Sequence, residues 1–338
     1  TTVAISFAGL GSICTAFGSF STTFLVIKPS NKHNYGSCMR TPTSFPTFTA
    51  LMRVHTSLET IKQVRRPVLT TGTFDGVHRG HRTMLQRLTA IAKDEGGESV
   101  LFTFHPHPRM VLFPGDNDLK LLCTHEEKIA LLEAAGSEHL LVIPFSRDFS
   151  RMRATDYVRE FLVGEIGVRC VVVGYDHRFG RNREGDLLLL RQLGDMNDFR
   201  VEEIPAQEVD HVRVSSTKVR NALLEGKVEV ANELLGYHYP LSGVVVKGDQ
   251  LGRTLGYPTA NIGAIDQHKL VPLDGIYTTG VEVGGEQHVG MLYIGDRPTI
   301  RTTETQKSIE VYIFDLDRDL YGESITVRLK DRIRGDMQ

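Results

Sequence analysis

Between about residues 65 and 205, short apolar runs alternate with amphipathic runs, and this alternation constrains the fold more than any other feature of the chain. Apolar runs of this length predict buried strands, and apolar residues at helical spacing predict helices. We expect strands at Val68–Thr71, Ser99–Phe104, His139–Ile143, Cys170–Gly174 and Val201–Ile204, and helices near 81–94, 125–135, 155–163 and 187–193. Such a pattern predicts an α/β domain whose parallel sheet is covered by helices on both faces.

The pattern changes after residue 236. Tyr237-His238-Tyr239-Pro240 predicts a boundary, and Gly284-Gly285 predicts a hairpin turn. We expect strands at Ser242–Lys247, Gly275–Val283, His288–Ile294, Ser308–Phe314 and Glu323–Leu329. Short strands at this spacing predict a small antiparallel β-barrel. The expected domains are therefore 52–236 and 237–338, after an N-terminal extension over 1–51.

A strand-to-helix turn is the first candidate site. From Thr71 to His81 the chain reads Thr-Gly-Thr-Phe-Asp-Gly-Val-His-Arg-Gly-His, between the first expected strand and the first expected helix. Glycines let the backbone approach a ligand closely, and the unpaired N–H groups of a helix N-terminus bind phosphate. Two histidines, His78 and His81, add donors that can follow charge developing on a phosphoryl group.

Two further loops follow expected strands, at the edge where ligands of parallel sheets bind. Phe104-His105-Pro106-His107-Pro108-Arg109 must leave the sheet, because proline offers no donor to a ladder. Taken alone, His107 is expected to be a solvated side chain. The Arg-rich loop from Gly174 to Arg181 is also typical of plain surface, but its place after a strand favours a pocket.

The fourth segment, from Arg213 to Arg220, reads Arg-Val-Ser-Ser-Thr-Lys-Val-Arg and leads into an expected helix over Lys218–Glu225. A single hydroxyl there would be explained as a helix cap. Here hydroxyls, a helix dipole and two arginines converge, which suits a triphosphate.

Two segments mark the expected barrel. Gly248 to Asn261 reads Gly-Asp-Gln-Leu-Gly-Arg-Thr-Leu-Gly-Tyr-Pro-Thr-Ala-Asn, in which Thr259 or Asn261 taken singly would be a turn residue after proline. Ser308 to Asp315 reads Ser-Ile-Glu-Val-Tyr-Ile-Phe-Asp, whose alternation places Glu310 and Tyr312 on one face of a strand. An exposed glutamate on a strand is usually only solvated.

Together these segments resemble the bifunctional riboflavin kinase/FAD synthetase family. Gly72 to His81 resembles the histidine signature of its nucleotidyltransferase domain, and Ser215-Ser216-Thr217 with Arg220 resembles the signature that closes that site. Leu255 to Asn261 resembles the riboflavin kinase signature. The resemblance covers about 52–338 and implies a Rossmann-like nucleotidyltransferase domain followed by a β-barrel kinase domain. It implies phosphorylation of riboflavin to FMN by ATP, and adenylylation of FMN to FAD with release of pyrophosphate.

The resemblance also implies roles for residues of the two sites. His78, His81 and Glu310 would be catalytic, with Glu310 acting as base toward the ribityl 5′-hydroxyl. Contacts to ATP or its phosphates would come from Gly72, Phe74, Asp75, Gly76, Arg213, Ser215, Ser216, Thr217, Arg220 and Gly252. The flavin or nucleotide pocket would include His105, Pro106, Asp176 and Arg178.

Magnesium is the metal that the resemblance implies, held beside the ATP phosphates by Thr259 and Asn261. Neutral oxygen ligands suit Mg²⁺ because it retains water and takes phosphate oxygens. Relatives usually carry histidine where Tyr312 stands and asparagine where Tyr293 stands, so no role is transferred to either. Relatives also usually continue beyond the position of Gln338 into a final helix, and a truncation there is expected to weaken flavin affinity or the barrel.

Composition limits the partners. The net charge of −2 at pH 7 argues against nucleic acid, and no run is apolar enough to span a membrane. The four cysteines have no metal spacing and fit a reducing compartment, so we expect a cytoplasmic protein. Riboflavin, FMN and ATP are the expected partners, and a weak homo-oligomer is left open.

Residues 1–51 contain no Asp or Glu and are rich in Ser and Thr, as organelle transit segments are. Their scarcity of arginine and the lack of an amphipathic helix favour translated upstream sequence or a misplaced start instead. Met52 to His55 resembles a start in the family, and we expect no catalytic residue before it.

Other functions fit part of the sequence. A nucleotidyltransferase for another substrate would explain the first and fourth segments but not the barrel signature. A flavin-binding protein without activity would explain the folds, and retention of His78, His81, Thr259, Asn261 and Glu310 argues against it.

Overall fold

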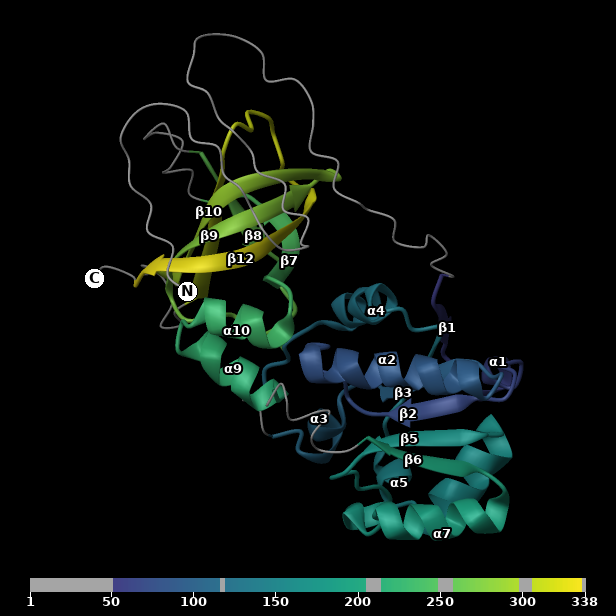
Figure 1. Cartoon of the computed structure of the whole chain (residues 1–338). Helices are drawn as coiled ribbons and strands as arrows, with labels where there is room; N and C mark the ends of the chain where they lie inside the picture. The colour runs from purple at the N-terminus through teal and green to yellow at the C-terminus, as the bar shows by residue number, and fades with distance from the viewer. Residues whose placement is uncertain (1–50, 116–118, 205–213, 249–257, 298–305, 336–338) are drawn as a thin grey trace, which may run out of the picture. The chain divides into compact units, whose positions relative to one another are not determined.

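The computed structural model describes residues 51–115, 119–204, 214–248, 258–297 and 306–335 of the 338-residue chain (Figure 1). All of them fall within one compact unit. Among these residues, no helix has the length and apolarity needed to cross a bilayer.

The first part of the chain forms a parallel sheet with the strand order β1-β4-β3-β2-β5-β6. The strands are β1 (Arg53–His55), β2 (Val68–Thr71), β3 (Ser99–Phe104), β4 (His139–Ile143), β5 (Cys170–Gly174) and β6 (Arg200–Ile204). Every pairing among them is parallel. The five expected strands are therefore confirmed. The edge strand β1 was not expected, because a strand of three residues is too short to show periodicity.

Helices cover both faces of this sheet, as expected (Figure 1). On one face α2 (Arg79–Asp94) and α4 (His125–Ala134) share a core with Val172; on the other, η1 (Tyr157–Ile166) and α7 (Leu187–Asn197) share a core with Val171 and Val173. Shorter helical segments are α1 (Leu58–Ile61), α3 (Pro108–Leu112), α5 (Arg147–Ser150), α6 (Ala154–Asp156) and η2 (Arg181–Arg183).

Two of these helical regions show how local sequence sets the start or the type of a helix. Thr124 and Glu127 form a capping box at the start of α4: Glu127 N donates to Thr124 Oγ1, and Thr124 N donates to Glu127 Oε2. The helix expected over 155–163 is instead formed by α6 and then by η1, whose π-type hydrogen bonds run on to Ile166.

The strand order reverses between β2 and β5. Successive strands run from β2 through β3 to β4 on one side, whereas β5 and β6 lie on the other side. In an open parallel sheet the crevice at such a reversal is where ligands bind. The turn that carries His78 and His81 follows β2, so it lies at this position.

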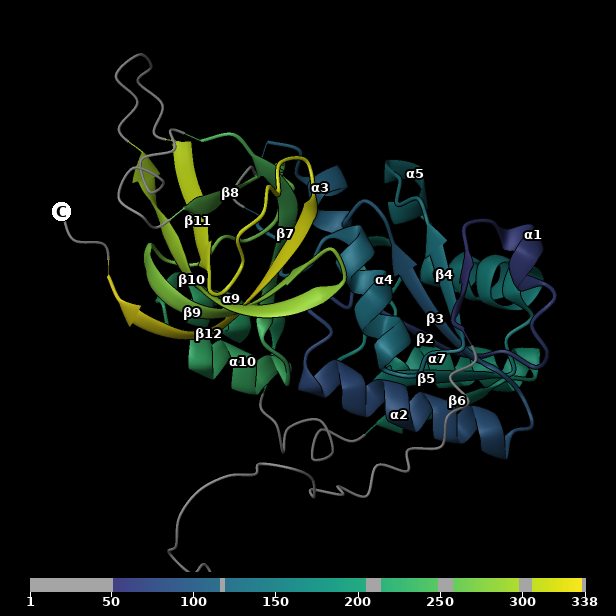
Figure 2. The ribbon, with the colours of Figure 1, turned by 90° about the horizontal axis from the view of Figure 1, so that it is seen from above.

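The second part of the chain forms a closed antiparallel barrel with the order β10-β11-β8-β7-β12-β9 (Figure 2). Its strands are β7 (Tyr239–Val246), β8 (Thr259–Gly263), β9 (Gly275–Val283), β10 (Glu286–Arg297), β11 (Gln306–Ile313) and β12 (Ser324–Arg334). The expected barrel is confirmed, as is the hairpin: Gly284 and Gly285 join β9 to β10 with positive φ angles. The strand β8 was not expected. Thr259 and Asn261 therefore lie on a strand rather than in a turn.

Two helices precede the barrel, α9 (Ser216–Leu224) and α10 (Val228–Leu235). Their buried residues, including Val219 and Leu235, belong to the same apolar cluster as Tyr239 and other barrel residues. The helix expected over Lys218–Glu225 begins earlier, because Ser215 is its N-cap. The domain boundary near 236 stays a prediction.

Candidate active sites

The turn after β2 is held in shape by buried residues beneath it. Phe74 and Val77 are almost fully buried and have positive φ angles, as does Gly76. At Gly76 a side chain is excluded, because a Cβ would lie 2.8 Å from a Leu122 methyl carbon. The turn is thus a fixed platform that leads directly into α2.

The two histidines of this turn stack on each other. Their ring centroids are 3.7 Å apart with an interplanar angle of 13°. His78 is the N-cap of α2, and its Nδ1 accepts a hydrogen bond of 3.3 Å from His81 N. Burial lowers the pKa of His78 to about 4, so the ring is neutral near pH 7. A neutral ring that accepts at Nδ1 carries its proton on Nε2, which is left as a donor.

His81 lies in the first turn of α2, next to His78. Its Nδ1 is buried and has no hydrogen-bond partner among the described residues. Burial lowers the pKa of His81 well below its usual value, and the neighbouring His78 adds to this effect. The edge of the Phe74 ring packs against it, with centroids 5.3 Å apart. Phe74 therefore packs against the His81 ring.

Asp75 connects the first and fourth segments of the sequence. Its Oδ2 receives a 2.7 Å hydrogen bond from Arg220 Nη2, and its Oδ1 receives one of 2.9 Å from Leu122 N. Asp75 is 4% exposed. A buried carboxylate that is already paired is poorly suited to contact phosphate, so this geometry favours a positioning role over the direct ATP contact expected for Asp75.

Helix α9 presents its hydroxyl residues to the same turn. Ser216 Oγ donates to the carbonyl oxygen of Asp75 at 2.9 Å, and Ser215 caps the helix by accepting from Lys218 N. Thr217 is exposed in the first turn of α9. The structure thus brings the two signatures together although Ser216 and Asp75 are 141 residues apart.

Two residues that the sequence did not single out also hold the turn. Tyr237 donates from its hydroxyl to the carbonyl oxygen of Gly76 at 2.6 Å, and Gly76 N donates to the buried thiol of Cys123 at 3.1 Å. Nothing local in the sequence connects either residue with Gly76, since only the folded chain brings them together. Gly72, also expected at this site, donates from its backbone N to Phe102 O and so ties the start of the turn to β3.

The loop after β3 carries His105, Pro106 and His107. The ring of His105 stacks on His125 of α4, with centroids 4.3 Å apart, and Pro106 is exposed. His107 caps α3 and is partly buried, and burial together with the charge of Lys128 lowers its pKa to about 4. The expectation that His107 is a solvated side chain was therefore wrong.

The loop after β5 lines a shallow pocket of about 390 Å³ that includes Asp176 and Arg178. Arg178 forms an ion pair of 3.5 Å with Asp186, and Asp176 is exposed. Since β5 pairs with β2, this pocket and the histidine turn lie at the carboxyl ends of neighbouring strands. Arg213 and Gly252, the other expected phosphate contacts, lie outside the described residues.

On the barrel, β8 and β11 bring the expected kinase residues together. In the antiparallel register Glu310 is opposite Asn261, and Tyr312 is opposite Thr259. Thr259 Oγ1 donates to Glu310 Oε2 at 3.0 Å, and Ser308 Oγ donates to Glu310 Oε1 at 2.8 Å. Two hydroxyls thus fix the orientation of the Glu310 carboxylate.

This donor set fits Mg²⁺. A hydroxyl, an amide and a carboxylate are the hard oxygen ligands that Mg²⁺ takes, alongside phosphate and water. Among the described residues, no cluster of three or more His, Cys, Asp or Glu side chains is arranged to hold a metal. A cation at Thr259 and Asn261 would therefore depend on substrate phosphates to complete its coordination.

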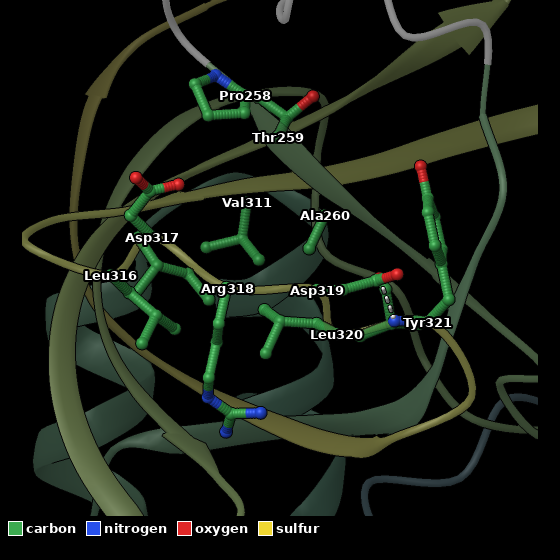
Figure 3. Close-up of a pocket in the computed structure, with 12 residues that line it drawn as sticks. Pro258, Thr259, Ala260, Val311, Leu316, Asp317, Arg318, Asp319, Leu320 and Tyr321 are labelled. Carbon is green, nitrogen blue, oxygen red and sulfur yellow. Dashed lines mark hydrogen bonds between the residues drawn. The ribbon is translucent and has the colours of Figure 1, made fainter.

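A cavity of about 250 Å³ opens next to Thr259 (Figure 3). Its apolar walls come from Val311 of β11 and from Leu316 and Leu320 of the following loop. The same loop contributes charged side chains at Asp317, Arg318 and Asp319. A cavity that has both apolar walls and charged side chains can accept a ring system that carries a polar tail.

Comparison with known proteins agrees with this architecture. The family model described as FAD synthetase matches residues 60–218, and the model described as riboflavin kinase matches residues 235–338. A crystal structure named as a macrolide-efflux protein from Streptococcus pneumoniae superposes with a TM-score of 0.77 and 30% identity, covering 85% of this chain and 92% of that one.

Curated relatives extend over both parts of the chain. The bifunctional riboflavin kinase/FMN adenylyltransferase of Escherichia coli K12 is 38% identical over 272 residues, which cover 80% of this chain and 85% of the relative. The protein of the same name from Listeria monocytogenes is 36% identical over 271 residues, with the same coverage. This chain belongs to the bifunctional riboflavin kinase/FMN adenylyltransferase family.

Proposed function

We infer that this chain phosphorylates riboflavin with ATP to give FMN, and adenylylates FMN with a second ATP to give FAD and pyrophosphate. The observation that carries this function is the presence of both sites in one chain. A histidine turn clamped by α9 lies where the strand order of the parallel sheet reverses, and a Thr259–Glu310 pair lies on the barrel. Membership of the family supports both reactions.

For adenylyl transfer, we assign His78 and His81 to the charge that develops at the α-phosphorus. An FMN phosphate oxygen attacks that phosphorus, the bond to the bridging oxygen breaks, and pyrophosphate leaves. The reaction needs no protein nucleophile, so catalysis comes from positioning and electrostatic stabilisation. His78 supplies its Nε2–H as a fixed donor, since its Nδ1 is occupied by His81 N.

We assign the N-terminus of α9 to the phosphates of ATP. Its first-turn N–H groups and Thr217 present donors and the positive end of the helix dipole. Arg220 and Ser216 position this helix on the turn through Asp75. Asp176 and Arg178 are assigned to the flavin or nucleotide pocket after β5.

For the kinase reaction, we assign Glu310 as the base that orients and deprotonates the ribityl 5′-hydroxyl. Thr259 and Asn261 would hold Mg²⁺, which when bound neutralises charge on the ATP phosphates. The cavity beside Thr259 is assigned to one of the two substrates of this reaction. Ser308 and Thr259 hold the Glu310 carboxylate in a single orientation, which suits a base.

The test is product analysis of the full chain by chromatography, with riboflavin, ATP and Mg²⁺ supplied. We expect FMN to appear first and FAD to follow. If only FMN forms, the function is restricted to the barrel. If neither product forms, the chain is a flavin-binding protein without activity. Supplying FMN in place of riboflavin isolates the second reaction, since FAD should then form without the kinase step.

A further inference from the structure

Helix α4 of the α/β domain carries a lysine whose side chain has no partner in the part of the chain that the structure describes. Lys128 of α4 is 7% exposed. Its side chain makes no hydrogen bond to any described residue, and no described carboxylate oxygen lies within 4.0 Å of it. Lys269 provides the contrast: it is also buried, but it pairs with Glu127 and donates to the carbonyl oxygen of Leu122. Lys128 is therefore a largely buried lysine whose ammonium has no counter-ion among the described residues.

Lys128 belongs to the environment of the histidine turn. It lies in the first turn of α4, and the residues just before that helix, Leu122 and Cys123, donate backbone hydrogen bonds to Asp75. After burial, the charge of Lys128 is the next largest cause of the lowered pKa of His107. It also acts on His81, after burial and after His78.

The stem of Lys128 is buried, but its Nζ is not fully enclosed, so the ammonium is open to an anionic ligand. The nearby carboxylates are already engaged, since Asp75 is paired with Arg220 and Glu127 with Lys269. His81 Nδ1 is buried without a described partner in the same region. An anionic ligand at the turn would supply the counter-ion that the described residues do not.

We propose that Lys128 is a catalytic residue of adenylyl transfer, whose ammonium binds a phosphate oxygen of ATP or of FMN. The proposal rests on the proposed function. A charged donor that a buried stem holds in place stabilises charge on a phosphate. It would act together with the neutral donors His78 and His81, which carry no charge of their own.

The experiment compares Lys128→Met with the wild type and with a matched control, Lys93→Met, which removes an exposed lysine from α2. Methionine has a similar volume, and replacing a buried charge by an apolar group of similar size is often neutral or stabilising. We expect Lys128→Met to keep its melting temperature and its riboflavin kinase rate. We expect its FMN adenylylation kcat/KM to fall about 100- to 1,000-fold, as for loss of one transition-state donor.

Two further measurements identify the phosphate. Pyrophosphate is titrated into each protein by calorimetry, and KM is measured separately for ATP and for FMN. Loss of pyrophosphate binding with a raised KM for ATP assigns Lys128 to ATP, whereas a raised KM for FMN alone assigns it to FMN. Lys128→Arg, which keeps the charge, should recover part of the rate, and a merely structural role predicts no such recovery.

Three results would overturn the proposal. One is adenylylation and pyrophosphate binding by Lys128→Met at wild-type levels. Another is an equal loss of both activities with a lowered melting temperature. A third is failure of both Lys128→Met and Lys128→Arg to fold, which would make the lysine a core residue. If the wild-type chain itself forms no FAD, the proposed function fails instead, so the two failures are distinguishable.

Discussion

Replacing Asp75 by asparagine removes the charge that anchors the histidine turn to α9. The carboxylate accepts a hydrogen bond of 2.7 Å from Arg220 Nη2 and one of 2.9 Å from Leu122 N. Asparagine offers one oxygen and one NH₂ group, so either Arg220 or the backbone N–H then faces a donor. Breaking a buried ion pair by removing one partner costs about 3–5 kcal/mol. The Arg220 side chain is 21% exposed, so water relieves part of this cost and we expect the lower end.

About 3 kcal/mol corresponds to roughly a 150-fold change in the folding equilibrium constant. We would measure it by urea unfolding followed by far-UV circular dichroism, because the sequence contains no tryptophan. A double-mutant cycle with Arg220→Gln separates the pair from its surroundings. The coupling energy should be about 2–3 kcal/mol. The matched control is the exposed pair Lys62–Glu165, joined at 2.9 Å, which should couple by less than about 1 kcal/mol.

Asp75→Asn should also lower FMN adenylylation, since Ser216 and Arg220 no longer hold α9 against the turn. Riboflavin phosphorylation should persist, because Glu310 and Thr259 make no contact with Asp75 among the described interactions. A coupling energy no larger than that of the control pair would refute the reasoning. So would an adenylylation rate equal to that of the wild type.

Four other predictions follow from the two sites. His81→Ala should lower FMN adenylylation about a hundredfold and spare riboflavin phosphorylation, and equal loss in both assays would contradict two separate sites. Glu310→Gln should do the reverse, and an unchanged kinase rate would exclude it as base. Because the pKa of His78 is lowered to about 4 from 6.5, adenylylation kcat/KM should stay constant as the pH falls through 6.5 and should decrease toward pH 4. The stability that the neutral ring contributes is complete above pH 6.5 and is lost between pH 6.5 and pH 4. An inflection of kcat/KM near pH 6.5 would argue against this reasoning. Tyr237→Phe removes the hydroxyl that donates to Gly76 O and should slow adenylylation alone, and parallel melting curves would show that the fold is kept.

Periodicity and turn chemistry determined much of this protein from sequence. The alternation of apolar and amphipathic runs is a local property, so five strands of the sheet and the Gly284-Gly285 hairpin were predicted at their observed places. The strands β1 and β8 were missed. The first is too short to show a period, and the second was hidden because its Thr259 and Asn261 carry a signature that suggested a turn.

The tertiary structure decided which side chains meet and which are buried. Asp75 and Arg220 are 145 residues apart, and whether they form an ion pair depends on how α9 packs beside the turn. Lys128 follows an ordinary capping box, and nothing in that pattern distinguishes it from an exposed lysine. Burial is set by the neighbours that a folded chain brings together. Sequence therefore determined the two folds and their chemical groups, while packing determined that Asp75 is buried and paired with Arg220 and that Lys128 has no counter-ion among the described residues.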